Sequence, residues 1–284
     1  MAGPRRDTRG IVEARELLAR VRFRRREPDP RLRPYLEHYW LIDWDLTEPY
    51  ASHVVPHPCV NIVFQQYGDE PAWAEVAGIG LKLFTQKLTG RGRVCGVQFR
   101  PGGFRPLAPD RPVSDWTGRR VPLAEVLPGT GQDTVDAVVA PEQEDARVAA
   151  LDSFLLDLSP EADPQAREAM ELVDRIRFDR SIRRVAELAA AEGVSARSLQ
   201  RLFAAYVGVG PKWVILRYRI HEALERAENA ENAGHAEHTE GEAAGLDWAA
   251  LAAELGYSDQ AHLVRDFTAT VGVPPTAYAR TAAP

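Results

Sequence analysis

The chain has 284 residues, more than one ordinary domain and fewer than three, so we expect two domains. Apolar residues make up 45% and charged residues 27% of the sequence, a composition that excludes disordered and fibrous proteins. The net charge of −6 argues, on its face, against a partner as anionic as nucleic acid.

The sequence shows neither a secretion signal nor a pattern of cysteines that would form disulfides. The first 30 residues are rich in arginine without the apolar core of a secretion signal, and no stretch approaches the roughly 18 apolar residues of a membrane-spanning helix. The only two cysteines, Cys59 and Cys95, are too few for a disulfide framework or a multi-cysteine zinc site. We therefore expect a cytoplasmic protein with no membrane contact.

The N-terminal segment, residues 1–29, is predicted to be a basic helix and arm. Residues 11–21 place Ile11, Leu17, Leu18 and Val21 on one helical face, and residues 22–26 follow as a basic arm.

Residues 30–145 are predicted to form a β-rich domain, barrel-like or sandwich-like, that serves an effector or a dimerisation role. Pro28, Pro30 and Pro34 exclude a helix, and the short apolar runs HYWLIDWDL, VNIVFQQY and RVCGVQF favour an antiparallel sheet. Its aromatic residues either line an apolar small-molecule pocket or fill the core, and core is the expected role of most. The candidate effector-binding residues are Trp40, Trp44, Phe64 and Phe99.

A metal site is a weaker hypothesis for the same domain. His53, His57 and Cys59 lie close in sequence, and Cys95 is a candidate fourth ligand. Prolines on both sides of His57 and the absence of any paired metal-ligand spacing argue against it. We predict no metal and no cofactor.

The remainder of the chain is helical in character, with a connector at residues 146–165 and an all-α domain at 166–284. Within that domain the segments starting at Ala186 and Ala249 repeat each other. The offset is 63 residues up to the glycines Gly193 and Gly256 and 64 residues beyond them, so the second copy has one extra residue in its turn.

Each copy has the pattern of a helix-turn-helix: a short helix, a glycine, a serine cap and a second amphipathic helix. Leu199, Leu202 and Phe203 face inward in the first copy, and Leu263 and Phe267 do so in the second. The outward residues have long donors that suit base edges and phosphates. The candidate DNA-binding residues are Ser195, Arg197, Gln200 and Arg201 in the first copy, and Ser258, Gln260, His262 and Arg265 in the second.

From about Ile182 to Tyr278 the sequence resembles the AraC/XylS family of bacterial transcription regulators, most closely in GYSDQAHLVRDFTATVGVPPTAY. The resemblance implies recognition helices at 196–206 and 259–270, which enter successive major-groove segments of DNA. It also implies a joining helix at 211–227. The side of this helix expected to pack carries Trp213, Leu216, Ile220 and Leu224.

The chain departs from the family pattern in two places. The loop at about 228–246 is longer and more acidic than usual, and Leu263 and Val264 replace a frequent aromatic residue and a small polar residue. Residues 30–125 resemble an uncharacterised β-rich domain found at the amino end of some family members.

These observations together favour an α+β, non-enzymatic, DNA-binding transcription regulator. Candidate partners are double-stranded DNA, RNA polymerase, a second copy joined through the N-terminal domain and a small-molecule effector. The alternative is a β-barrel enzyme or metal-dependent sensor fused to a DNA-binding domain. No serine-hydrolase elbow, P-loop or dinucleotide fingerprint supports an enzyme, and an RNA-binding or purely structural helical protein would leave the repeat unexplained.

The net charge of −6 no longer argues against a DNA partner once the charge of separate segments is counted. Residues 175–221 hold ten lysines and arginines against three acidic residues, whereas residues 222–247 hold eight acidic residues and one arginine. The total therefore hides a basic helix-turn-helix beside an acidic segment.

Overall fold

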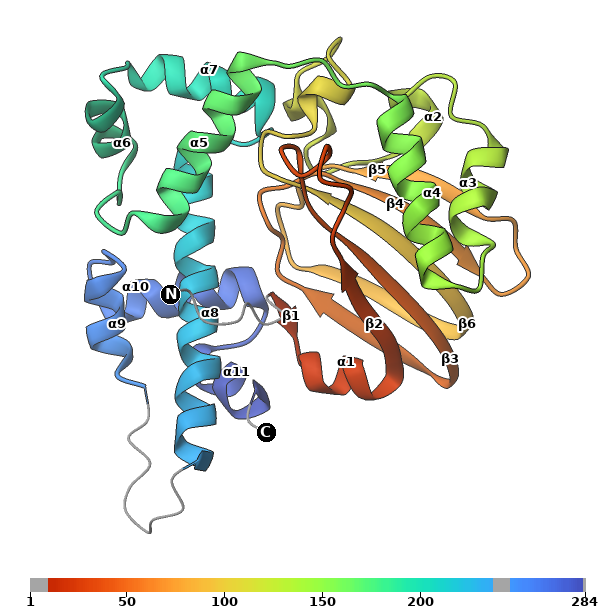
Figure 1. The fold of residues 1–284 in the computed structure, drawn as a ribbon. Helices are drawn as coiled ribbons and strands as arrows, with labels where there is room; N and C mark the ends of the chain where they lie inside the picture. The colour runs from red at the N-terminus through yellow and green to blue at the C-terminus, as the bar shows by residue number, and fades with distance from the viewer. Residues whose placement is uncertain (1–9, 237–245, 283–284) are drawn as a thin grey trace.

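The computed structural model describes residues 10–236 and 246–282, and it has the expected α+β organisation: an N-terminal sheet and a C-terminal set of helices (Figure 1). Within these ranges no helix is both long enough and apolar enough to cross a membrane.

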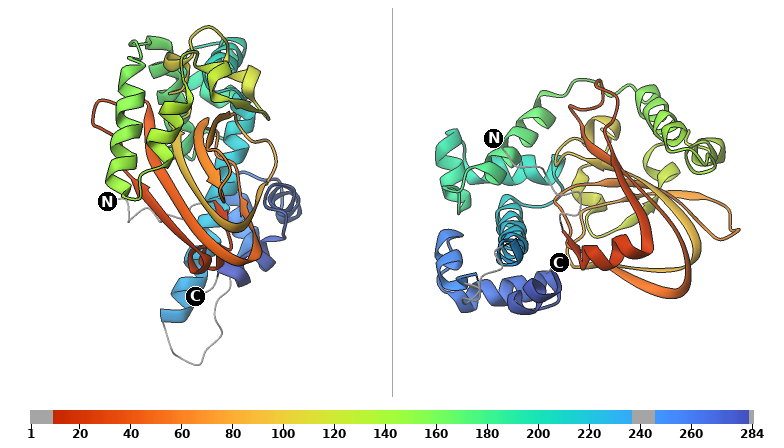
Figure 2. Two further views of the ribbon diagram at one scale, coloured as in Figure 1. Left: turned by 90° about the vertical axis from the view of Figure 1, so that its right-hand side faces the viewer. Right: turned by 60° about the horizontal axis from the view of Figure 1, so that its bottom comes forward.

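From residue 10 onward the N-terminal half is built on one antiparallel sheet and not on two packed sheets. Its strands are β1 (Ile11–Val12), β2 (Val21–Arg26), β3 (Leu36–Val54), β4 (Asn61–Tyr67), β5 (Trp73–Ala77), β6 (Phe84–Phe99) and β7 (Arg120–Pro122). The order is β1-β3-β6-β4-β5-β7, and β2 also pairs with β3. β3 and β6 are long, and their pairing shifts register between Leu46 and Tyr50. The sheet curves strongly, as Figure 2 shows, and one of its faces is concave.

The N-terminal segment differs from the predicted helix and arm. Residues 11–26 form β1, a short α1 (Ala14–Arg20) and β2, so the basic run is a strand of the sheet. Side chains alternate along a strand. Arg24 and Arg26 face the acidic start of α4 (Glu144–Asp157), where both pair with Glu144, while Phe23 lies on the concave face.

The convex face of the sheet carries a layer of short helices: η1 (Arg105–Leu107), η2 (Val113–Trp116), α2 (Leu123–Val126), α3 (Gln132–Val139) and α4. Asp43 of β3 binds three arginines there, Arg24, Arg93 and Arg147, and Arg147 of α4 is almost fully buried. Burial of so many charges requires this mutual pairing. Because α4 packs on the sheet, it belongs to the N-terminal domain and is not a free connector.

The described part of the C-terminal half is helical, with α5 (Pro164–Phe178), α6 (Val185–Glu192), α7 (Ala196–Tyr206), α8 (Pro211–Ala236), α9 (Trp248–Glu254), α10 (Gln260–Val271) and α11 (Pro275–Ala282). The joining helix α8 extends beyond residue 227, so the first part of the predicted acidic loop is helical. The rest of that loop, residues 237–245, lies outside the described residues.

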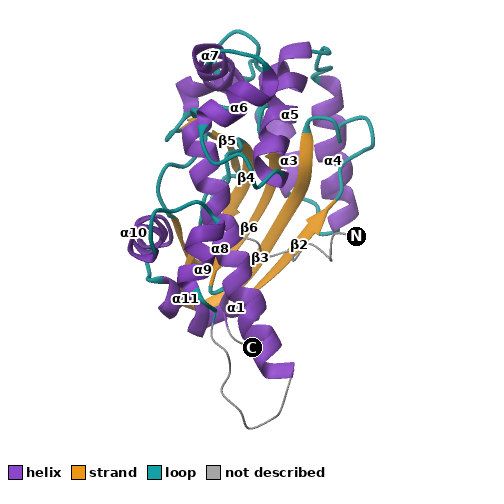
Figure 3. Ribbon diagram, turned by 90° about the vertical axis from the view of Figure 1, so that its left-hand side faces the viewer, coloured by secondary structure: helices purple, strands orange, loops and turns teal. Residues whose placement is uncertain are grey.

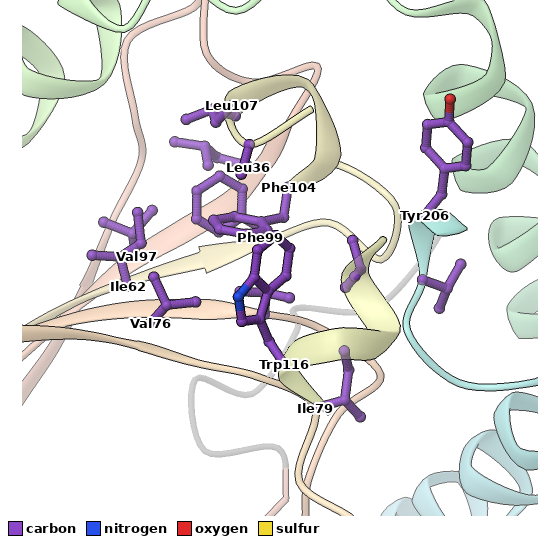
Figure 4. Close-up of a cluster of buried hydrophobic side chains, with 14 of the residues drawn as sticks. Leu36, Ile62, Val76, Ile79, Val97, Phe99, Phe104, Leu107, Trp116 and Tyr206 are labelled. Atoms are coloured by element: carbon purple, nitrogen blue, oxygen red, sulfur yellow. The ribbon is translucent and has the colours of Figure 1, made fainter. Parts of the chain in front are cut away.

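The two halves share their hydrophobic cores. One cluster runs from the sheet through Phe99, Phe104 and Trp116, whose rings pack edge to face, to Tyr206 of α7 (Figure 4). A second cluster surrounds α8, α9, α10 and α11 and includes Val12 and Val55 of the N-terminal half. The helical units are therefore held directly against the sheet domain.

Candidate nucleic-acid interface and ligand cavity

The first helix-turn-helix unit consists of α6 and α7. Gly193 ends α6 with φ at 65°, a left-handed conformation that favours glycine. The Ser195 hydroxyl then accepts a hydrogen bond from the backbone N–H of Ser198 at 3.1 Å, which caps α7. Leu199 and Phe203 are buried, as the helical period predicts.

The second unit, α9 and α10, repeats this geometry with one difference. Gly256 has φ at 75°, but the cap is Asp259, which accepts from the N–H of His262 at 2.7 Å. The expected cap, Ser258, lies one residue earlier and hydrogen-bonds to the His262 ring at 3.2 Å. The extra residue in the second turn causes this shift.

The predicted base-reading side chains lie on the two second helices, and most are available to a partner. Arg197, Gln200, Arg201, Gln260 and Arg265 are exposed. In the part of the chain that the structure describes, none of these five forms an ion pair or a side-chain hydrogen bond.

His262 is less available than the other candidates. It is half-buried, its ring meets Tyr257 edge-on with the centroids 5.1 Å apart, and Nε2 lies 3.8 Å from Asp266. Hydrogen bonding to the His262 N–H holds the pKa of Asp259 below its ordinary value.

The two second helices point the same way. Figure 3 shows α7 and α10 nearly end-on, at different levels along α8. Their C-terminal ends contact the N-terminal domain: Gly208 packs against Ile79, and Gly272 packs against Leu83. The N-terminal ends, which carry the exposed arginines and glutamines and the positive end of each helix dipole, therefore project away from the sheet.

A set of polar contacts connects the two units. Arg183, just before α6, donates to the carbonyl of Glu254 at 3.0 Å, and Arg180 pairs with Glu222 of α8 at 2.7 Å. Arg219 of α8 donates to the Arg183 carbonyl and lies 5.5 Å from the centre of the Tyr257 ring. The relative position of the two recognition helices is thus fixed by α8 and its neighbours.

A cavity of about 240 Å³ occupies the concave face of the sheet. Trp40 and Trp44 line it, as predicted. Phe64 and Phe99 do not, because they lie on the opposite face, buried in the core under the helices. Strand alternation explains this difference, since both neighbours of Phe64, Val63 and Gln65, line the cavity.

Two glycines make room for the tryptophans. Trp40 pairs with Gly96, and Trp44 pairs with Gly92, across β3 and β6. A Cβ atom at Gly96 would lie 1.9 Å from the Trp40 indole, and one at Gly92 would lie 2.0 Å from the Trp44 indole. Each ring therefore lies over a glycine of the neighbouring strand, which fixes its orientation in the cavity wall.

One wall of the cavity also contacts α8. Pro56 and His57 line the cavity, and the His57 ring stacks on the ring of His221 in α8, with centroids 4.0 Å apart and planes 11° apart. His221 is fully buried, and its Nε2 lies 3.2 Å from the carbonyl oxygen of Pro56. Nearby, Arg217 of α8 is 6% exposed, and burial lowers its pKa to about 10, so it remains a cation at neutral pH.

The structure separates the residues of the metal hypothesis. His53 hydrogen-bonds to Thr85 at 2.9 Å, His57 stacks on His221, and Cys95 lies on the convex face beside Arg147. Burial raises the pKa of the Cys59 thiol to about 12, so the thiol by itself is protonated at neutral pH. Among the described residues no group of three or more His, Cys, Asp or Glu side chains could hold a metal ion.

Sequence reasoning missed the cap Asp259 and the contact residue His221. The 64-residue offset of the repeat already aligns Asp259 with Ser195, so the cap was detectable. His221 carries no such signal, because its role depends on a partner 164 positions earlier in the chain.

Comparisons with known proteins give a partial match. Residues 24–122 match a family model described as a domain of unknown function (DUF6597). A search of curated proteins finds no match.

Similar solved structures include several of ToxT from Vibrio cholerae. One at 1.65 Å resolution is 9% identical, with a TM-score of 0.44, and the match covers 86% of this chain and 97% of ToxT. Another, bound to (E)-4-(8-methylnaphthalen-1-yl)but-3-enoic acid, is 11% identical, with a TM-score of 0.44, and covers 92% and 99%.

Proposed function

We propose that this chain is a sequence-specific, DNA-binding transcription regulator of the AraC/XylS type, controlled by a small molecule that binds its N-terminal domain. The observation that carries the proposal is the pair of helix-turn-helix units whose second helices run parallel and present exposed arginines and glutamines away from the sheet domain.

This arrangement suits two consecutive segments of a major groove. The donors of Arg197, Arg201 and Arg265 match guanine edges and phosphates, and those of Gln200 and Gln260 match adenine edges. In such a complex the two helices occupy segments about one helical turn, roughly 34 Å, apart. Binding that depends on these cations weakens steeply as the salt concentration rises.

The cavity is the proposed effector site, and α8 is the proposed route from it to the DNA. His57 belongs both to the cavity wall and to the stack on His221. Because α8 contacts both helix-turn-helix units, a change in the cavity wall that moves His57 alters the position of the recognition helices.

The experiment that tests DNA binding begins with genomic fragments selected by the purified chain. On a selected site, Arg201→Ala and Arg265→Ala should each weaken specific binding by about 1–3 kcal/mol, because each removes a donor at the DNA surface. Fluorescence anisotropy at fixed salt measures the affinity, and Arg15→Ala, an exposed arginine of α1, is the matched control.

The circular dichroism spectra of all three variants should equal that of the parent chain. If the two recognition-helix variants bind as tightly as the Arg15→Ala control, the assignment of these helices is wrong.

A further inference from the structure

The cavity has a polar end and an apolar end, and the strand register locates both. One row across the sheet consists of His38, Gln98, Asn61, Ala77 and Arg120, each paired with the next, and all five line the cavity. Six residues further along these strands, Trp44, Gly92 and Tyr67 are neighbours, and the centres of the Trp44 and Tyr67 rings lie 5.2 Å apart. Asn61 and Tyr67 are six residues apart on β4, about 20 Å along the strand.

The charges at the polar end lie at the edges of the sheet and not at its centre. Arg120 is on the edge strand β7 and forms an ion pair with Glu75 at 2.5 Å. The Glu75 carboxylate also accepts from the Gln65 side chain. Arg25 is on β2 at the opposite edge, where its guanidinium lies 5.8 Å from the centre of the Phe23 ring.

The central strands present uncharged amides. Gln98 of β6 lies between His38 and Asn61 in the row, and its amide makes no hydrogen bond to any other described side chain or backbone group. Asn61 accepts from the Trp40 indole N–H at 3.3 Å. An amide offers both a donor and an acceptor, so this centre matches a neutral head group that does the same.

An anionic head group fits this centre poorly. Among the described residues no aspartate or glutamate lines the cavity, and its two arginines, Arg25 and Arg120, lie at the edges of the sheet, where Arg120 is paired with Glu75. A carboxylate brought there loses its hydration without gaining an ion pair and approaches the Glu75 carboxylate.

We propose that the cavity binds a neutral amphiphile, a molecule with a flat apolar body that lies along Trp40 and Trp44 and an uncharged hydrogen-bonding head that contacts Gln98. This inference rests on the proposed effector role of the N-terminal domain and adds the chemical class of the effector. The two indoles are four residues apart, about 13 Å along β3, a span suited to a body of at least two aromatic rings.

The test compares three probes that differ only in the head: biphenyl-4-carboxamide, biphenyl-4-carboxylate and biphenyl. Titration calorimetry and thermal shift on the full chain, without DNA, should give the amide at least about tenfold tighter binding than the other two. Gln98→Leu should weaken the amide about three- to tenfold and leave biphenyl unchanged.

The control is Gln66→Leu, the same substitution on β4 at a residue that does not line the cavity and donates to the Glu70 carbonyl. It should leave all three probes unchanged.

The proposal is overturned if the carboxylate or biphenyl binds as tightly as the amide, if Gln98→Leu leaves the amide affinity unchanged, or if no probe binds. DNA affinity is measured separately on the chain without a probe, so each of these results leaves the DNA-binding proposal to be judged on its own. A carboxylate that binds tightly and alters DNA affinity would support the effector role while refuting the class proposed here.

Discussion

At the scale of single residues, the cap of each recognition helix determines how that helix begins. Ser195 is neutral, whereas Asp259 introduces a carboxylate at the start of α10. The same position is therefore filled by groups that respond differently to acid.

The lowered pKa of Asp259 leads to a prediction about how the stability of the chain depends on pH. A carboxyl group whose pKa is lower in the folded than in the unfolded chain contributes stability above its unfolded pKa of about 3.9, and this contribution is lost as pH falls through the folded value. In urea unfolding between pH 6 and pH 3, the parent chain should lose more stability than Asp259→Ser, which keeps a neutral cap. Parallel loss in both proteins would show that the cap carboxylate does not contribute.

Individual site residues could be predicted where their placement depends on neighbours in sequence, and could not where it depends on distant segments. Helical period and capping involve neighbours in sequence, so the exposed side of α7 and α10 was predictable. The face on which Phe64 lies was not, because VNIVFQQY has large apolar residues on both faces of the strand, Phe64 on one and Val63 and Tyr67 on the other. Only the packing of α4 on one face and the cavity on the other separates Phe64 from Val63.

At the scale of elements, α8 contacts both the cavity wall, through His57, and the two helix-turn-helix units. Its predicted start at residue 211 is confirmed, and Ile220 and Leu224 are buried as expected. Trp213 and Leu216 are only half-buried, and Val214 and Tyr218 are buried deeper. The period of α8 identified it as a helix but could not identify its partners, because one of its sides packs on a domain far away in sequence.

The stack of His57 on His221 leads to a prediction about α8. His221→Ala removes a fully buried ring and its contact with Pro56, so the central turns of α8 should open more readily and their amides should exchange faster with deuterium. His53→Ala, at a histidine of β3 whose ring hydrogen-bonds to Thr85 of β6, is the control and should leave exchange in α8 unchanged.

Equal exchange of α8 in the His221→Ala variant and the parent would mean that the stack does not hold the helix. The proposed route from cavity to DNA would then lack its connection.

At the scale of the whole molecule, the chain combines the basic surface proposed to bind DNA with an acidic segment. The glutamates of residues 222–247 directly follow residues 175–221, which hold ten lysines and arginines against three acidic residues. Residues 228–236 continue α8, and Glu228 binds the Tyr278 hydroxyl at 2.6 Å, so deleting the whole acidic segment would also damage the fold.

A charge-only change is therefore the sharper test of the acidic segment. Replacing Glu237, Glu240 and Glu242 together with glutamine removes three negative charges and should tighten non-specific DNA binding, with the largest effect at low salt. A salt titration measured by anisotropy checks this. The control replaces Glu125, Asp133 and Asp136 of the N-terminal domain by their amides, with no change expected; equal effects in both triple variants would assign the change to net charge alone.

The two-domain organisation was predictable from composition and the repeat, but the join between the halves was not. Val12 was expected in a helix and Val55 follows the end of β3, yet both complete the hydrophobic core around α8 and α10. Such contacts depend on the final placement of whole domains, and no local pattern encodes that placement.

The most direct test of the central claim is the spacing of the DNA site. Fragments selected from the genome should share two sequence elements with centres about one helical turn apart, and inserting 5 base pairs between them should weaken binding at least tenfold, since α8 and its neighbours hold the two recognition helices at a fixed separation. Selected fragments with a single element, or an affinity that does not change on insertion, would contradict the account.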